Sequence, residues 1–162
     1  SYFAQVAECV CQEDFSTPEL LSLTLNCLYA LGTLHLPQQQ VKAAFELRVA
    51  CLAGYEPELG GCAVCGAPNP DRFNVSQGVL QCAGCRTELL EGLRLPVSGG
   101  TLSAMRYHTS CPLPRLLAFQ LSASALQELS NLTEVYLMTQ LERGFSTLDF
   151  YKSILPQQEA NL

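Results

Sequence analysis

The sequence predicts an all-α fold: a helical bundle with an inserted four-cysteine subdomain of the zinc-ribbon kind. Two observations lead to this prediction. Leucine-rich segments with helical periodicity lie on both sides of the middle of the chain. Between them stand two Cys-x-x-Cys pairs at a spacing typical of zinc sites. We therefore assign residues 1–57 and 96–155 to the bundle and residues 58–95 to the insert.

Three helices are expected before the insert. The first covers residues 2–11, where apolar side chains recur at helical spacing. The second begins at Pro18 behind the hydroxyl caps of Ser16 and Thr17 and runs to Gly32, and its many leucines predict the central helix of the core. The third runs from residue 38 to residue 53, with Gly54 as its C-terminal stop.

The chain returns to helix after the insert. Residues 95–100 are expected to be a linker, and residues 101–108 a helix that ends before Cys111-Pro112. One further turn is expected at residues 115–119. The last long helix covers residues 125–143 and is capped by Ser122 or Ser124, and residues 147–155 add a short closing helix.

The insert is expected to hold one metal ion. Cys62 and Cys65 form one pair, and Cys82 and Cys85 form the other after an interval of sixteen residues. Two such knuckles complete the tetrahedral sulfur cage that zinc prefers. Gly66 suits the positive φ with which the chain leaves the first knuckle. A hairpin of residues 72–75 and 79–81 with a glycine at its turn is expected between the pairs.

A structural role is the first reading of this site, because protein sulfurs fill all four coordination positions. Binding energy on the order of 10 kcal/mol would then stabilise an insert with few apolar residues. A deaminase would need a His-x-Glu or Cys-x-Glu partner before its Pro-Cys-x-x-Cys motif, and neither His35 nor His108 is followed by glutamate at that offset. Three alternatives remain open: a redox or metal-sensing switch that loses zinc on oxidation, a generic zinc-ribbon interaction module and, more weakly, a zinc hydrolase.

Composition limits the cellular compartment and the kinds of partner that the chain can have. The chain has 162 residues, and no apolar run approaches the ~20 residues of a membrane-spanning helix. Nine cysteines, five of them outside the two pairs, favour free thiols and a reducing cytoplasm. The formal charge of −6 argues against a general nucleic-acid clamp. Arg72, Arg86 and Arg94 are expected to offset the charge of the metal centre, and the two histidines, His35 and His108, to lie at the surface or at caps.

Several motifs together resemble the C-terminal part of the RecO family of bacterial recombination mediators. They are Phe45-Glu46-Leu47-Arg48, Gly54-Tyr55-Glu56-Pro57, the paired knuckles and the ending around Tyr136, Leu141 and residues 146–150. The resemblance covers nearly all of the chain. It implies a non-enzymatic DNA repair protein of the cytoplasm, associated with the nucleoid, whose one zinc is structural.

The same resemblance implies partners. The family works with RecR to help RecA load on single-stranded DNA coated with single-strand-binding protein, and it promotes annealing. Its members begin with an OB-fold of about eighty residues, so we expect this chain to be a piece that lacks the main DNA-binding module. Lys42, Arg48 and Arg115 are the candidate partner or DNA contacts. Ala43 and Ala44 beside Lys42 speak against capture of the acidic tail of single-strand-binding protein.

Overall fold

Helices begin and end the described chain, and a small sheet lies between them in the sequence. The computed structural model describes residues 2–12 and 18–144. In order, its elements are α1 (Tyr2–Gln12), α2 (Pro18–Gly32), α3 (Gln38–Leu52), β1 (Glu58–Cys62), β2 (Arg72–Asn74), β3 (Val79–Gln81), the 3-10 turn η1 (Glu88–Leu90), β4 (Arg94–Pro96), α4 (Gly99–Ser110), the 3-10 turn η2 (Leu113–Arg115) and α5 (Ala123–Gly144).

The prediction of an all-α fold is wrong, because the strands form a four-stranded mixed sheet in the order β1-β3-β2-β4. The expected hairpin is present as the antiparallel pair β2 and β3, with Phe73 opposite Leu80. Strand β1 pairs with β3 in parallel, and β4 pairs with β2 in antiparallel fashion. The sequence concealed both strands, since β1 contains Gly60-Gly61 and β4 ends at Pro96 in the expected linker.

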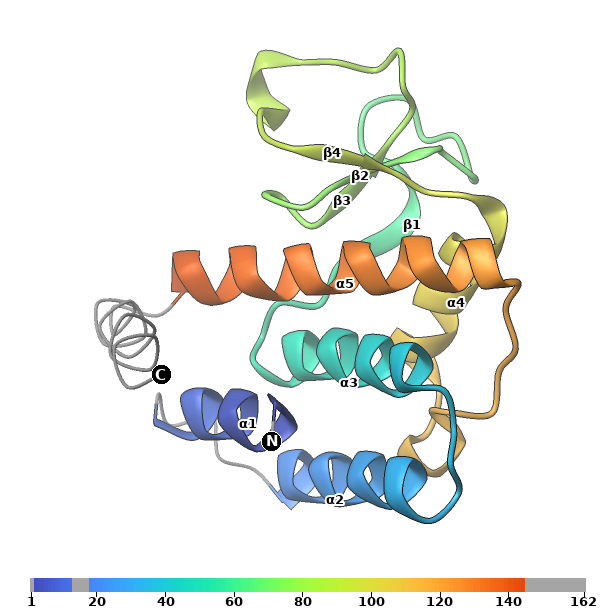
Figure 1. Cartoon of the computed structure of the whole chain (residues 1–162). Coiled ribbons are helices and arrows are strands. Elements are labelled where there is room, and N and C mark those ends of the chain that lie inside the picture. Colours follow the sequence, from blue (N-terminus) through green and yellow to red (C-terminus); the bar gives the residue numbers. More distant parts are fainter. Residues whose placement is uncertain (1, 13–17, 145–162) are drawn as a thin grey trace, which may run out of the picture.

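Helix α3, not α2, is the central helix of the core. Eight of its side chains are buried, and they lie on more than one face: Val41, Phe45 and Val49 on one stripe, and Ala43, Leu47 and Ala50 on another. In Figure 1, α3 lies between α2 and α5. Helix α2 buries one face only, since Leu21 and Leu25 on its other face are 62% and 57% exposed. The leucine content of α2 therefore predicted its buried face correctly, but the prediction that the whole helix is buried was wrong.

The sheet packs directly against α5, above which it lies in Figure 1. The Phe73 ring of β2 meets the Tyr136 ring of α5 edge-on, with centroids 5.2 Å apart. The Tyr136 hydroxyl donates to the carbonyl oxygen of Tyr55 at 2.7 Å, and Gln140 Nε2 donates to that of Val75 at 2.8 Å. Burial of these polar groups with their partners fixes the sheet on the helical body.

Most helix boundaries agree with the sequence. Helices α1, α2, α3 and α5 begin and end within two residues of the predicted positions, and Ser122 Oγ accepts from the Ala125 amide at 3.2 Å. Helix α4 begins at Gly99, earlier than expected, because the Ser98 side chain caps it through the Thr101 amide. The Ser16 and Thr17 caps and the closing helix at 147–155 lie outside the described residues. Among the described helices, none has the length and apolarity to span a bilayer.

A buried polar cluster joins α3 to α4. Arg48 of α3 donates through Nη2 to the carbonyl oxygen of Cys111, at the end of α4. His108 of α4 is completely buried, so its expected surface position is wrong, whereas His35 is exposed. Neither ring nitrogen of His108 has a hydrogen-bond partner among the described residues, and its ring stands edge-on to Phe119 at 4.2 Å. Burial, with a contribution from Arg48, lowers the pKa of His108 to about 4.

Candidate metal centre

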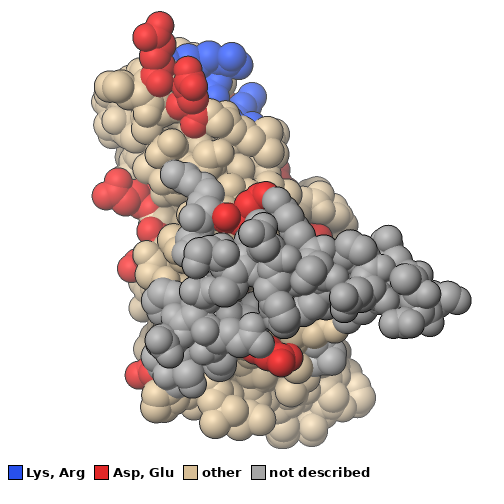
Figure 2. Space-filling view, turned by 90° about the vertical axis from the view of Figure 1, so that its left-hand side faces the viewer, with Lys and Arg blue, Asp and Glu red and all other residues tan. Residues whose placement is uncertain are grey.

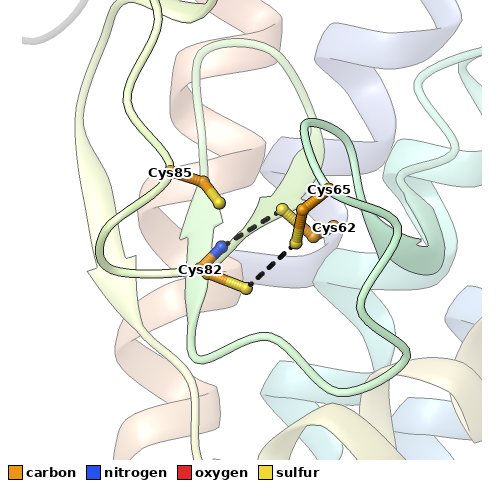
Figure 3. Close-up of side chains that lie close together, drawn as sticks. All are labelled: Cys62, Cys65, Cys82 and Cys85. Carbon is orange, nitrogen blue, oxygen red and sulfur yellow. Dashed lines mark hydrogen bonds between the residues drawn. The ribbon is translucent and has the colours of Figure 1, made fainter.

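The two cysteine pairs converge on one point. The chain passes from the C-terminal end of β1 into the first knuckle, with Cys62 and Cys65, and from the end of β3 into the second, with Cys82 and Cys85. Figure 3 shows the four sulfur atoms turned toward one another. All four lie within 4.8 Å of one another, and the sulfurs of Cys65 and Cys82 are 3.7 Å apart.

This geometry fits a tetrahedral metal ion. Zinc–sulfur bonds of about 2.3 Å in a tetrahedron place neighbouring sulfurs about 3.8 Å apart. The amides of Val64 and Cys82 both donate to the Cys62 sulfur at 3.4 Å. Such donors stabilise a thiolate, which is the form that binds a metal. Four sulfurs suit a soft or borderline ion and not magnesium or calcium, which prefer oxygen ligands.

The electrostatics of the cluster also favour a cation. Burial alone would raise the pKa of Cys62, but the backbone amides of Cys65, Val64 and Cys82 lower it to about 6. By contrast, the Cys65 side chain, and after it burial, raises the pKa of Cys82 to about 12. Sulfurs packed this closely repel as thiolates, and a bound cation removes that repulsion. The arrangement can therefore hold a metal ion, and it leaves no ligand position open for a substrate.

Side chains from outside the pairs support the second knuckle. The guanidinium of Arg94 in β4 donates to the carbonyl oxygens of Cys82, Ala83 and Cys85. Asp71 Oδ1 accepts from the Ala83 amide at 2.8 Å, and Gln81 Nε2 donates to the Cys85 carbonyl at 2.9 Å. Sequence reasoning assigned Arg94 only a charge-balancing role and missed Asp71 and Gln81. No local signal marked Arg94 for this contact, because the strand that carries it has only three residues and is defined by its pairing with β2.

The first knuckle relies on close backbone packing. Gly66 has the predicted positive φ, 77°, and its amide donates to the Cys62 carbonyl at 2.9 Å. A Cβ atom on Gly61 would lie 2.9 Å from the carbonyl oxygen of Ala67, so only glycine fits there without a shift. Arg106 of α4 connects this region to the helical body. Its Nε donates to the carbonyl oxygen of Leu59 at 2.9 Å, and its Nη2 donates to that of Pro68 at 2.6 Å.

The three candidate partner contacts do not share one cluster. Lys42 of α3 lies between two carboxylates, with Nζ 2.9 Å from Glu46 and 2.8 Å from Glu134. Arg48 contacts Cys111 inside the helical body. Arg115 of η2 is exposed, and no ion pair involves it among the described residues. These contacts stay predictions, since a partner is needed to test them.

The arginines of the insert differ in what they do. Arg72 pairs with Asp71 at 3.3 Å, Arg94 contacts the second knuckle, and Arg86 is exposed. Figure 2 shows Lys and Arg side chains at the sheet end of the molecule with acidic side chains beside them. Where grey atoms do not cover this face, it shows no broad basic surface. The insert is therefore not a concentrated positive patch on the visible face.

Comparison with known proteins assigns the chain to a family. The family model described as "Recombination protein O C terminal" matches residues 1–149. A DNA repair protein RecO of Acetivibrio thermocellus is 29% identical over 156 residues, which cover 95% of this chain and 61% of that relative. One of Anaeromyxobacter dehalogenans is 30% identical over 158 residues, 96% of this chain and 61% of the relative.

A third relative, DNA repair protein RecO of Rubrobacter xylanophilus, is 37% identical over 97 residues, or 56% of this chain. The chain thus spans about 61% of the length of the first two relatives. The match to the family model includes both knuckles, all four strands and α1 to α5. This chain belongs to the recombination protein O C-terminal family.

Proposed function

We propose that this chain is a metal-stapled partner-binding domain of a recombination-mediator DNA repair protein, with one structural zinc on Cys62, Cys65, Cys82 and Cys85. The observation that carries the proposal is the convergence of four sulfurs within 4.8 Å in a chain matched by the RecO C-terminal family over residues 1–149. The metal would join β1 to β3 at the point where each strand ends. Because the sheet packs on α5, the ion would also stabilise the arrangement of the sheet on the helical body.

Zinc is the proposed ion because four thiolates in a tetrahedron suit it best and need no redox chemistry. Iron also accepts a four-sulfur site, so the test must identify the element. We expect about one zinc per chain in protein purified under reducing conditions, measured by atomic emission, in line with one four-sulfur site. A Cys82→Ala variant should lose the zinc, whereas Cys111→Ala, which changes a cysteine outside the site, should keep it. Iron or no metal in the unmodified protein would contradict the proposal.

The domain is proposed to act by binding and not by catalysis. In support, protein ligands fill the metal site, which leaves no position for a reactive water. In the family role that we propose, the whole protein works with RecR to help RecA load on single-stranded DNA coated with single-strand-binding protein, and promotes annealing. The cytoplasm, at the nucleoid, is the proposed location. The free, buried thiol of Cys27 suits that reducing compartment.

Binding of single-stranded DNA by this chain alone is proposed to be weak. The formal charge is −6, and five of the described Lys and Arg side chains are held by contacts within the chain: Lys42, Arg48, Arg72, Arg94 and Arg106. Of the described cationic side chains, this leaves Arg86 and Arg115 without a hydrogen bond or an ion pair. Few phosphates can then be neutralised, and affinity should fall steeply with salt.

A fluorescently labelled oligonucleotide tests this proposal. We expect measurable binding only at low salt and its loss at about 0.15 M salt. Tight binding that persists at that salt concentration would contradict it. For RecR, titration of the labelled partner should be compared between Arg115→Glu and Arg86→Glu, which make the same charge change at two exposed sites. A loss confined to Arg115→Glu would support the predicted contact, and equal affinities would remove it.

Capture of the tail of single-strand-binding protein is disfavoured. Lys42 already contacts Glu46 and Glu134, and the neighbouring Ala43 and Ala44 are fully buried. An acidic peptide would compete with two carboxylates for one ammonium group. We expect a peptide with the acidic, Phe-ended sequence of that tail to bind weakly and without dependence on Lys42, as measured by fluorescence anisotropy with a Lys42→Ala variant. A strong, Lys42-dependent interaction would reverse this view.

One observation favours the redox switch as a second candidate function. The exposed Cys65 has its sulfur 3.7 Å from that of Cys82, so two-electron oxidation by a peroxide could join the two as a disulfide and reduce the peroxide to water. The metal would lose two ligands. Zinc per chain before and after mild peroxide separates the candidates: retained metal with unchanged partner binding supports the structural role, and metal loss with altered binding supports the switch.

A further inference from the structure

The guanidinium group of Arg94 binds the backbone of the second knuckle. Its Nη1 donates to the carbonyl oxygens of Cys82 and Cys85 at 3.2 and 3.4 Å, and its Nη2 donates to that of Ala83 at 3.2 Å. Three of the four residues from Cys82 to Cys85 thus share one side chain as a donor. A guanidinium is planar and rigid, so these bonds fix the relative orientation of the peptide groups that accept them.

The orientation of those peptide groups decides where the sulfurs point. Two of the three acceptors belong to Cys82 and Cys85 themselves, so fixing these carbonyls restricts the backbone torsions from which both sulfurs are placed. The Cys82 amide, on the inner side, donates to the Cys62 sulfur at 3.4 Å. Arg94 therefore acts on the metal ligands through the backbone and touches no sulfur in any described contact.

The first knuckle has no equivalent. Among the described residues, no side chain donates to the carbonyl oxygens of Cys62 to Cys65, and the turn is closed by the Gly66 amide on Cys62 O. Cys65 of this knuckle is also exposed. Side-chain support of the metal loops is therefore concentrated on one half of the site, the half that β4 reaches.

We propose that Arg94 is the positioning residue of the metal centre: its guanidinium holds Cys82 and Cys85 in metal-binding geometry before the ion arrives and slows loss of the ion afterwards. This inference rests on the proposed metal binding and extends it to a residue outside the ligand set. The role is geometric. A purely electrostatic role, in which any nearby cation offsets the charge of the thiolates, is the alternative that the experiment must separate.

Arg86 provides the matched control for charge. It follows Cys85 directly in the chain, its side chain is exposed, and it makes no contact with the knuckle carbonyls among the described residues. Arg86→Met and Arg94→Met remove the same charge close to the same sulfurs. Arg94→Lys keeps the charge but replaces the rigid fork by a single ammonium group, which cannot reach three carbonyls in the same arrangement.

Metal affinity is measured by competition between the purified, reduced protein and a chromophoric zinc chelator, and the release rate by an excess of the same chelator. Supporting contacts of this kind typically contribute about 10–100-fold to metal affinity. We expect a loss of this size in Arg94→Met, faster release of zinc, an intermediate loss in Arg94→Lys, and wild-type affinity in Arg86→Met. Equal affinities for Arg94→Met and wild type, or equal losses in Arg94→Met and Arg86→Met, would overturn the proposal.

Two further measurements distinguish positioning from general loosening of the sheet. At saturating cobalt(II), the visible absorption bands report the geometry of the four-sulfur site, and we expect them to change in Arg94→Met but not in Arg86→Met. Tyr136→Phe removes the hydrogen bond from α5 to the Tyr55 carbonyl and alters no described contact of either knuckle, so it should leave zinc affinity unchanged. A loss in Tyr136→Phe as large as that in Arg94→Met would assign the effect to stability and overturn the proposal. If wild type binds no metal, the proposed metal site itself fails, a different result from unchanged affinity in the variant.

Discussion

Acid should destabilise this domain through His108. The ring, on α4, is completely buried, and burial together with Arg48 of α3 lowers its pKa from 6.5 to about 4. As the pH falls below 6.5, the unfolded chain therefore binds a proton that the folded chain does not. The stability associated with the neutral ring is fully present above pH 6.5 and is lost as the pH falls toward 4.

The size of the effect follows from the two pKa values. The gap between 6.5 and about 4 corresponds to about 3 kcal/mol when the loss is complete, and to about 2 kcal/mol at pH 5. His108→Phe removes the titration and keeps an aromatic ring against Phe119. It sacrifices no hydrogen bond, since neither ring nitrogen has a partner among the described residues. At neutral pH the larger ring is expected to cost about 1–3 kcal/mol through overpacking.

Urea unfolding followed by circular dichroism at several pH values measures the difference between the two proteins. Effects of pH on the metal ligands and carboxylates are common to both and cancel in that difference. We expect wild type to lose about 2 kcal/mol more than His108→Phe between neutral pH and pH 5. His35→Gln is the matched control for loss of one imidazole, because His35 is exposed. A difference between wild type and His108→Phe that does not vary with pH would refute the reasoning.

Three further predictions concern the sheet and the metal site. Cys65→Ala should abolish tight zinc binding and loosen the insert. Far-UV circular dichroism should keep most of its helical signal, because the helices around α3 have their own apolar core. Complete loss of helicity would show instead that the sheet and the helices unfold as one unit. Tyr136→Phe should lower the free energy of urea unfolding by about 1–3 kcal/mol, because the Tyr55 carbonyl loses its 2.7 Å donor, and an unchanged midpoint would count against that bond. Gly61→Ala should weaken zinc binding in the chelator competition, because its Cβ would lie 2.9 Å from Ala67 O, whereas Gly60→Ala, with nothing within 4 Å, should not.

The helices and the cysteine cluster were predictable because each depends on neighbours in the sequence. Helical periodicity, the stop at Gly54 and the Ser122 cap are local signals, and they placed α3 and α5 within two residues. The spacing of Cys62, Cys65, Cys82 and Cys85 likewise encodes two local turns. Zinc chemistry led us to expect that the two turns face each other. The structure brings their four sulfurs together, as expected.

Long-range pairing was not predictable from the same signals. β4 has three residues, and Arg94 and Leu95 form a strand only because β2 offers a partner about twenty residues earlier. The choice of central helix failed for a similar reason: α3 has modest leucine content, but small residues such as Ala43, Ala44 and Ala50 let its neighbours approach from every side. No local sequence signal marks His108 as buried. Its burial results from contacts with Phe119 and from the packing of α4 on α3.

Both margins of the small sheet are protected against strand addition by another molecule. At the β1 margin, the Leu59 carbonyl is occupied by Arg106 and the Cys62 amide by Ala67. At the opposite margin, β4 is only three residues long and ends in Pro96, which has no amide hydrogen to offer. Exposed strand margins commonly seed aggregation, and short or capped ones suppress it. The chain can therefore be concentrated with little risk of growth into β-rich assemblies from this sheet.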